Sequence, residues 1–202
     1  MILTIAVMAG LMATLLRASY LRQPLQPPTL RSVWLVAAAF LPQWLAFHWA
    51  RTAQLLPYEA AAALLILSQL LLLAFVWRNW RQVGVPLLGF GVALNLAVIV
   101  ANGGLMPIFP DVVTRFAPGA TGTWAIGERL WWSKDIVLLP LATNLPWLAD
   151  RFLLPDWLPL RAAYSLGDVF IALGAFRLLW SISDNKQSTR VTVGSQVRAT
   201  NL

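Results

Sequence analysis

The stretch A-A-A-A-L-L-I-L-S-Q-L-L-L-L-A-F-V-W, which runs from Ala60 to Trp77, decides the fold class of this chain. A helix needs roughly 20 consecutive apolar residues to cross a bilayer, and about 17–25 are tolerated. The stretch has this length and holds no charged side chain. Arg78 and Arg81 follow it closely, as expected of cations that mark the membrane surface. We therefore predict a transmembrane helix over about residues 58–77.

Four further stretches are apolar enough to span a membrane. We predict helices at about 1–20, 32–50, 85–102 and 166–182. The first residues lack the positive region of a signal peptide, so they are predicted to form an uncleaved helix. The prediction is an all-α membrane protein with five transmembrane helices. One transmembrane domain covers residues 1–183, and residues 184–202 form a polar cytoplasmic tail.

The composition excludes several classes of protein. Only 11% of the residues are charged, against about 25% in a soluble domain. The net charge of +7 lies at helix ends and in the tail rather than in a patch interleaved with aromatic residues, so we expect no nucleic-acid partner. The absence of cysteine excludes disulfides and thiolate metal sites, and a single histidine excludes multi-histidine metal sites.

The charges also predict an orientation. With the amino terminus placed outside, the inner segments carry a net charge of +8 and the outer segments −1. Because cytoplasmic loops of membrane proteins collect lysine and arginine, we predict that the amino terminus is outside and the carboxyl terminus inside.

A long outer segment, residues 103–163, separates the last two predicted helices. It holds seven of the thirteen prolines and five of the eleven tryptophans. Tryptophan prefers the headgroup zone of a bilayer. We therefore predict short interfacial helices on the outer leaflet, at about 124–139 and 145–154.

Two motifs flank this segment. In N-G-G-L-M-P, Asn102–Pro107, the glycines are typical of a helix C-cap, although their bare backbone amides could instead contact a ligand. In S-L-G-D, Ser165–Asp168, the spacing is that of a capping box at the start of the last helix. The alternative is that Asp168 pairs with a cation of the outer segment, for which the candidates are Arg161, Arg129 and Arg115.

A third motif, E-R-L-W-W-S-K-D, covers Glu128–Asp135. A hydrolase could use its two end carboxylates, but they are two helical turns apart with Lys134 beside one of them. We favour ion pairing within an interfacial helix. The sole histidine, His48, could be the axial ligand of a haem or chlorophyll. A hydrogen bond to water or a neighbour is the favoured interpretation for a lone histidine near the interface.

Charged residues are absent from the middle of the predicted spans, where the polar residues are Ser68, Gln69 and Asn95. These three could form hydrogen bonds between helices. Ion-coupled transport usually needs an ionisable residue at this depth, so a proton-driven transporter is disfavoured.

The combination of these motifs resembles a bacterial multi-pass membrane family that is described only as a domain of unknown function. The resemblance rests on N-G-G-x-M-P after the fourth helix, S-x-G-D at the fifth, and a partial match at Arg129–Asp135, where Lys134 replaces the family's usual glycine. It covers about residues 1–183. It implies a similar helix count and a bacterial cytoplasmic (inner) membrane location, and it implies no activity.

We expect the three motifs to meet in one cluster on the outer face. Its candidate residues are Asn102, Gly103, Gly104, Met106, Pro107, Arg129, Lys134, Asp135, Ser165 and Asp168. No catalytic or metal motif is evident. The leading hypothesis is a non-enzymatic accessory or scaffold subunit of a larger membrane complex, such as a respiratory or photosynthetic one, with membrane lipids and other subunits as partners. The alternative is a small membrane enzyme or lipid-binding protein that uses the cluster. A transporter is the least favoured reading.

Overall fold

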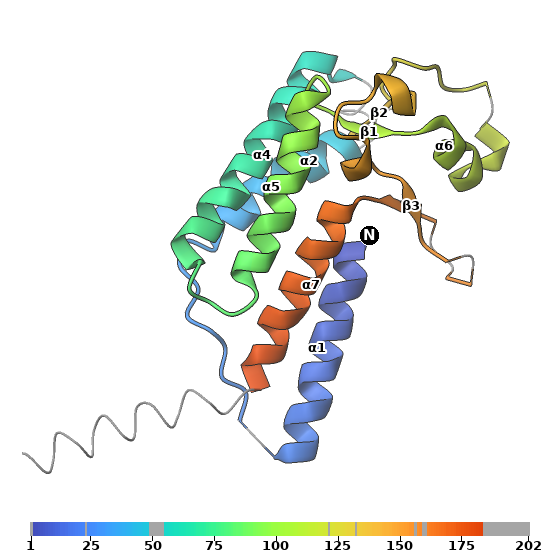
Figure 1. The fold of residues 1–202 in the computed structure, drawn as a ribbon. Helices are drawn as coiled ribbons and strands as arrows, with labels where there is room; N and C mark the ends of the chain where they lie inside the picture. Colours follow the sequence, from blue (N-terminus) through green and yellow to red (C-terminus); the bar gives the residue numbers. More distant parts are fainter. Residues whose placement is uncertain are drawn as a thin grey trace, which may run out of the picture.

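A computed structural model describes residues 2–22, 24–48, 55–120, 122–131, 133–155, 157–158 and 161–183. It is mostly helical (Figure 1). The long helices are α1 (Ile2–Leu21), α2 (Trp34–His48), α4 (Tyr58–Asn79), α5 (Val85–Ala101) and α7 (Leu166–Trp180). Each lies within a few residues of a predicted span. The predicted tail, residues 184–202, lies outside the described residues.

Three helical stretches in the described chain are long and apolar enough to cross a membrane. They are Leu3–Leu21, Tyr58–Asn79 and Leu166–Ser183, and α5 is a shorter apolar helix. Large apolar side chains on α4 remain exposed, among them Leu67, Leu70 and Trp77. Because water disfavours such a surface and a bilayer accepts it, these helices indicate a membrane protein.

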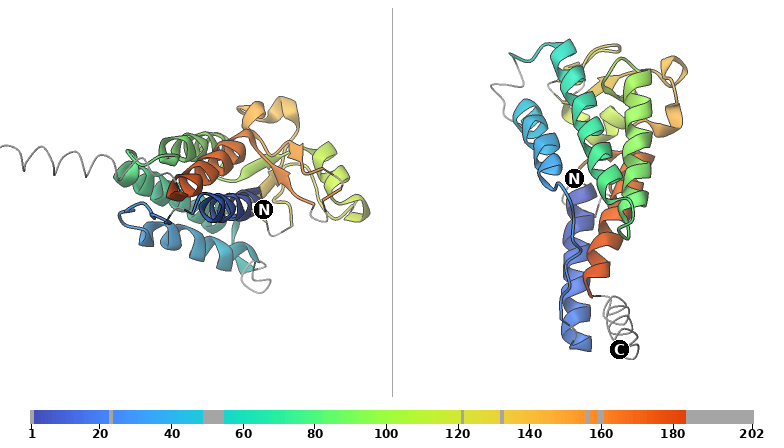
Figure 2. Two further views of the ribbon diagram at one scale, coloured as in Figure 1. Left: turned by 90° about the horizontal axis from the view of Figure 1, so that it is seen from below. Right: turned by 90° about the vertical axis from the view of Figure 1, so that its left-hand side faces the viewer.

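The helices pack as a row of neighbours, in the order α2, α4, α5, α7, α1. The two views in Figure 2 show α1 and α7 side by side. The pair α1–α7 is displaced along the bundle relative to α4–α5. Gly91, near the middle of α5, faces the start of α7 at Gly167, and Gly84, which precedes α5, faces Gly174. The first turn of α7 therefore lies beside the middle of α5.

The segment of residues 103–163, called here the inter-helix segment, folds at one end of the bundle. Two short strands, β1 (Met106–Ile108) and β2 (Asp135–Val137), pair in parallel, with Met106 opposite Asp135. Two others, β3 (Phe152–Leu153) and β4 (Ala163–Tyr164), pair in antiparallel fashion. The remaining elements in the described part of this segment are one short α-helix and three 3₁₀ turns: α6 (Pro110–Phe116), η1 (Pro118–Ala120), η2 (Pro140–Ala142) and η3 (Pro146–Leu148).

The predicted interfacial helices at 124–139 and 145–154 are wrong. Gly127 and Trp131 have positive φ angles of 87° and 49°, which no continuous α-helix accepts. In the second stretch, Leu145 has a φ of 54° and Pro146 follows it, so only the 3₁₀ turn η3 forms. Trp124 and Trp131, which suggested a helix, pack instead against a small core, whereas Trp147 remains exposed.

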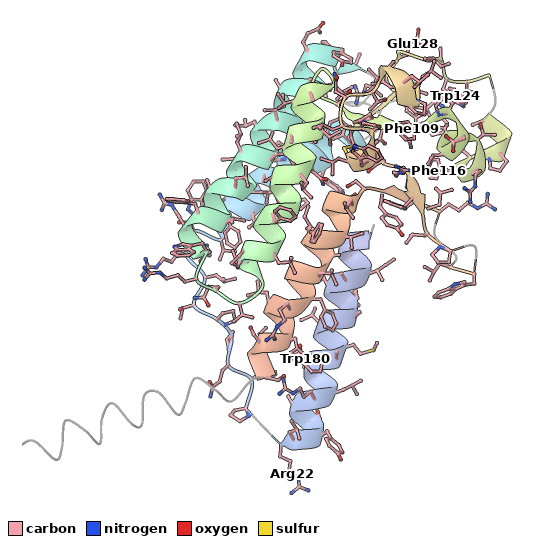
Figure 3. The ribbon with its side chains drawn as sticks, in the orientation of Figure 1. Arg22, Phe109, Phe116, Trp124, Glu128 and Trp180 are labelled. Atoms are coloured by element: carbon pink, nitrogen blue, oxygen red, sulfur yellow. The ribbon has the colours of Figure 1, made fainter. Side chains whose placement is uncertain are left out.

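This small core belongs to the inter-helix segment itself. Its buried members are Ile108, Phe109, Val112, Val113, Leu130, Val137 and Ala149, with Trp124 and Trp131 packed against them. Figure 3 shows Phe109, Phe116 and Trp124 within the segment and Glu128 at its periphery, where its side chain is exposed. A second core joins the segment to the bundle, because Leu105, Met106 and Ile136 are buried with residues of α4 and α5. The segment is thus a packed unit seated on the helices.

Candidate functional site: a polar cluster under the inter-helix segment

The turn after α5 brings the first motif into place. Gly103 and Gly104 have φ angles of 82° and 94°, and the amide of Gly104 donates to the carbonyl of Ile99 at 2.8 Å. This is the glycine C-cap that the sequence predicted. A Cβ on Gly104 would collide with the Cβ of Ala62 on α4, at 2.6 Å. Strand β1 begins just after this turn, and its residues Met106 and Pro107 are both buried.

Strand β1 connects the first motif to the third through backbone bonds. The amide of Met106 donates to the carbonyl of Lys134 at 3.0 Å. The amide of Asp150 donates to the carbonyl of Pro107 at 2.9 Å. Lys134 and Asp150 are therefore held on either side of one strand, although sixteen residues separate them in the sequence.

Lys134, Asp135 and Asp150 form what we call the lysine centre. The Nζ atom of Lys134 lies 2.8 Å from Oδ1 of Asp135 and 2.6 Å from Oδ2 of Asp150. The side chain of Asp150 is 2% exposed, whereas that of Lys134 is 41% exposed. Ser133 supports the centre, because its hydroxyl donates to Oδ2 of Asp135 at 3.1 Å. The predicted ion pairing of Lys134 is thus present in a loop and strand rather than in a helix.

Electrostatics shift two pKa values in the lysine centre. Burial raises the pKa of Asp150 to about 7: the ammonium of Lys134 opposes this effect, and the carboxylates of Asp135 and Asp168 add to it. Burial alone would lower the pKa of Lys134. Its three carboxylate neighbours outweigh that effect, so the pKa of Lys134 is raised and the amine stays charged.

Asn95, Ser165 and Asp168 form a second group, which we call the helix cap. The capping box predicted for S-L-G-D is confirmed: the hydroxyl of Ser165 accepts from the amide of Asp168, and the amide of Ser165 donates to Oδ2 of Asp168. Asp168 forms its remaining hydrogen bond with Asn95 rather than with one of the arginines that the sequence suggested. Asn95 lies six residues before the end of α5, so the helix cap is about 9 Å from that end, at a rise of about 1.5 Å per residue.

Asn102 and Asn144 form a third group, the asparagine pair. Nδ2 of Asn102 donates to the carbonyl of Asn144 at 2.8 Å, and its Oδ1 accepts from the amide of Asn144 at 2.9 Å. Nδ2 of Asn144 donates to the carbonyl of Ala101. These bonds fix the segment between η2 and η3 at the end of α5.

Arg129 anchors the inter-helix segment to a different part of the bundle. Its Nε donates to the carbonyl of Ser133 at 2.6 Å, its Nη1 donates to that of Leu56, and its guanidinium lies 5.3 Å from the ring centre of Phe47. Burial lowers its pKa, which the nearby Asp135 partly offsets. The side chain of His48, proposed as a pigment ligand, lies outside the described residues, although its backbone ends α2.

All ten candidate residues from the sequence lie in or beside these groups. Sequence reasoning missed two important members, Asp150 and Asn144, and it singled out Asn95 only as a polar residue within a span. Asp150 follows two apolar residues in L-A-D-R, a weak signal of a buried acid. Nothing in the sequence marks Asn144. Among the described residues, no group of three or more histidine, cysteine or acidic side chains is placed to hold a metal ion.

Comparison with known proteins adds a family but no activity. The model of the Family of unknown function (DUF5317) matches residues 28–180, which is well over half of the chain. This agrees with the resemblance seen in the sequence. No curated protein and no solved structure matches the chain.

Proposed function

We propose, from the premise that the chain belongs to the Family of unknown function (DUF5317), that the protein is a non-enzymatic subunit that scaffolds a larger membrane assembly. In this proposal five helices span the bacterial cytoplasmic membrane, with the amino terminus and the inter-helix segment outside, as the charge distribution favours. Membrane lipids and other membrane protein subunits are the partners.

The observation that carries the proposal is how the polar side chains of the cluster are used. Asn95, Asn102, Asp135, Ser165 and Asp168 all bond to other groups of this chain. The bonds of Asn95 join α5 to the start of α7, and those of Asn102 to Asn144 hold the inter-helix segment to the end of α5. A catalytic group needs a free donor, acceptor or nucleophile that faces its substrate, whereas these groups serve to position a unit on the bundle.

The same segment presents an apolar surface. We call it the apolar ledge, and its members are Leu139, Leu141, Leu145 and Trp147, in and around η2 and η3. Leu141 is fully exposed and Trp147 is 69% exposed. Because the asparagine pair fixes this stretch, a partner helix or chain would meet a preorganised surface, which reduces the entropy lost on binding.

The test is purification of the chain from its native membrane in a gentle detergent, with mass spectrometry and an absorbance spectrum. The proposal expects stoichiometric partner proteins, which the double substitution Leu141→Ser with Trp147→Ser on the ledge weakens. Val83→Ser, at an exposed apolar residue outside the ledge, is the matched control and leaves the partners bound. A colourless monomer with no co-purifying protein contradicts the proposal.

A second candidate is a lipid-binding protein or small membrane enzyme that uses the cluster. The observation in its favour is that the side chain of Lys134 remains 41% exposed, so a cation of the cluster is accessible to a ligand. This candidate expects a bound lipid, or an activity, that Asp168→Asn and Arg129→Ala abolish without unfolding the protein. If both variants only lower the stability, the cluster is structural.

A further inference from the structure

One of the six carboxylate oxygens of Asp135, Asp150 and Asp168 differs from the others in its hydrogen bonding. The two oxygens of Asp135 bond to Lys134 and Ser133, and those of Asp168 bond to Asn95 and to the amide of Ser165. Oδ2 of Asp150 bonds to Lys134. Oδ1 of Asp150 is buried and has no hydrogen-bond partner.

The charges around this atom do not balance. Three carboxylates influence the single ammonium of Lys134: Asp135 from β2, Asp150 from the turn after η3, and Asp168 from α7. The guanidinium of Arg129 interacts electrostatically with Asp135 and donates to the backbone carbonyls of Ser133 and Leu56. A buried ionised oxygen without a donor is much more costly than the same oxygen in a neutral carboxylic acid. Of the three acids, Asp150 is the one whose charge is least compensated.

Burial also limits what can reach Oδ1 of Asp150. The side chain is 2% exposed and the atom itself is not accessible, so this chain's own atoms enclose it. A lipid headgroup or a metabolite would have to displace part of the inter-helix segment. A proton needs no such space.

We propose that Asp150 is a proton-binding site, and that the proton it takes up tightens the attachment of the inter-helix segment to the start of α7. The step forms one O–H bond on the Asp150 carboxylate with a proton from water. Lys134 keeps its own proton, and no other bond is made or broken. Loss of the proton leaves three carboxylates around the ammonium of Lys134, with the guanidinium of Arg129 acting on Asp135. The mutual repulsion of the carboxylates then acts between β2, the turn after η3 and the start of α7.

The raised pKa of Asp150 supports this reading, and the sign of the pH effect follows from it. Between the ordinary aspartate pKa of about 3.9 and a folded-state value of about 7, the folded chain binds a proton at Asp150 that the unfolded chain does not. The free energy of unfolding therefore falls as the pH rises through this window. Above and below this window, the titration of Asp150 adds no pH dependence to the free energy of unfolding.

Infrared spectroscopy of the full chain in a detergent without ester or acid groups tests the site directly. The carbonyl stretch of a protonated carboxylic acid is expected at about pH 5 and is expected to weaken as the pH rises past about 7. Asp150→Asn abolishes the component of this band that titrates near pH 7. Asp111→Asn, at an exposed acid in the first turn of α6, retains it and is the control.

A stability measurement keeps the proposal testable if Asp150→Asn does not fold. The stability is compared at about pH 5 and pH 7, and histidine is the residue type whose ordinary pKa lies between these values, so the measurement uses a His48→Gln background. The unfolding midpoint is expected to be higher at about pH 5 than at about pH 7. The absence of a protonated-acid band at about pH 5 would overturn the proposal, and so would a midpoint that is flat or rises with pH. Either result would mean that Asp150 stays ionised and that an enclosed water satisfies Oδ1.

Discussion

Asn95, near the middle of α5, donates a hydrogen bond of 2.8 Å to Oδ1 of Asp168, in the first turn of α7, across 73 residues of chain. The carbonyl oxygen of the same Asn95 side chain accepts from the hydroxyl of Ser165 at 3.0 Å. Ser165 and Asp168 bond to each other in the capping box. The closed ring of bonds aligns the start of α7 with one position on α5. It fits only because residue 167 is glycine, since a Cβ there would collide with Asn95.

This ring predicts that Ser165→Ala is destabilising. The substitution removes the cap of α7 and leaves the buried carbonyl oxygen of Asn95 without its donor, so a loss of about 1–3 kcal/mol in the free energy of unfolding is expected. Ser19→Ala, at an exposed position on α1, is the control, with an expected change within about 0.5 kcal/mol. Denaturant titration in mixed micelles measures both. Equal effects of the two substitutions would mean that the ring contributes nothing to stability.

The close approach of α5 and α7 predicts that Gly91→Ala is destabilising. A Cβ on Gly91 would collide with the carbonyl oxygen of Gly167 and approach the amide nitrogen of Ile171 at 2.7 Å. Alanine favours a helix over glycine by about 1 kcal/mol, but backbone atoms cannot move aside as a side chain can. Overpacking of this kind costs about 1–3 kcal/mol, so we expect a lower unfolding midpoint.

Gly119→Ala is the matched control for this change, because no atom lies within 4 Å of the added Cβ. It should leave the unfolding midpoint unchanged. If Gly91→Ala instead raised the midpoint, helix propensity would outweigh the steric contact, and the two helices would have to be able to separate at little cost.

The lysine centre predicts that Lys134→Met strongly lowers the free energy of unfolding. The substitution leaves the buried carboxylate of Asp150 without a cation, and removing one partner of a buried ion pair costs about 3–5 kcal/mol. The loss should be largest above the pKa of Asp150, where the carboxylate is ionised, and smaller at lower pH. Unfolding titrations at two pH values measure this difference.

A double variant tests whether the charge left on Asp150 causes this loss of stability. In Lys134→Met with Asp150→Leu both charges are gone, so most of the lost stability should return. Arg115→Met, at an exposed cation on α6, controls for the loss of a positive charge. A double variant no more stable than Lys134→Met alone would show that the charge left on Asp150 is not the cause.

The asparagine pair predicts a local change in hydrogen exchange. Asn102→Ala removes the acceptor of the Asn144 amide, so this amide should exchange faster while the amides of α4 keep their protection. Asn144→Ala removes only the exposed bond to Ala101 and leaves the amide of residue 144 bonded to Asn102. It should therefore preserve the protection, and an equal loss in both variants would argue against the pair as the anchor of this segment.

The inter-helix segment shows where sequence reasoning failed. The aromatic residues near Trp124 and Trp131 suggested a helix on the membrane surface, but both pack on the segment's own small core. The positive φ angles of Gly127 and Trp131 follow from the turns that close this core. Hydrophobic composition cannot separate these outcomes, because an interfacial helix and a short strand over a core use the same residue types.

The sequence by itself determined the long helices, the glycine C-cap after α5 and the capping box of α7. Each depends on residues close together in the chain: an apolar run, two glycines after Asn102, and a serine three residues before an acid. Only the tertiary structure decided that α7 begins beside Asn95 and that Lys134 meets Asp150. Both contacts depend on where the backbones of α5, α7 and β1 come to rest. That placement results from packing between distant segments, which no local pattern in the sequence encodes.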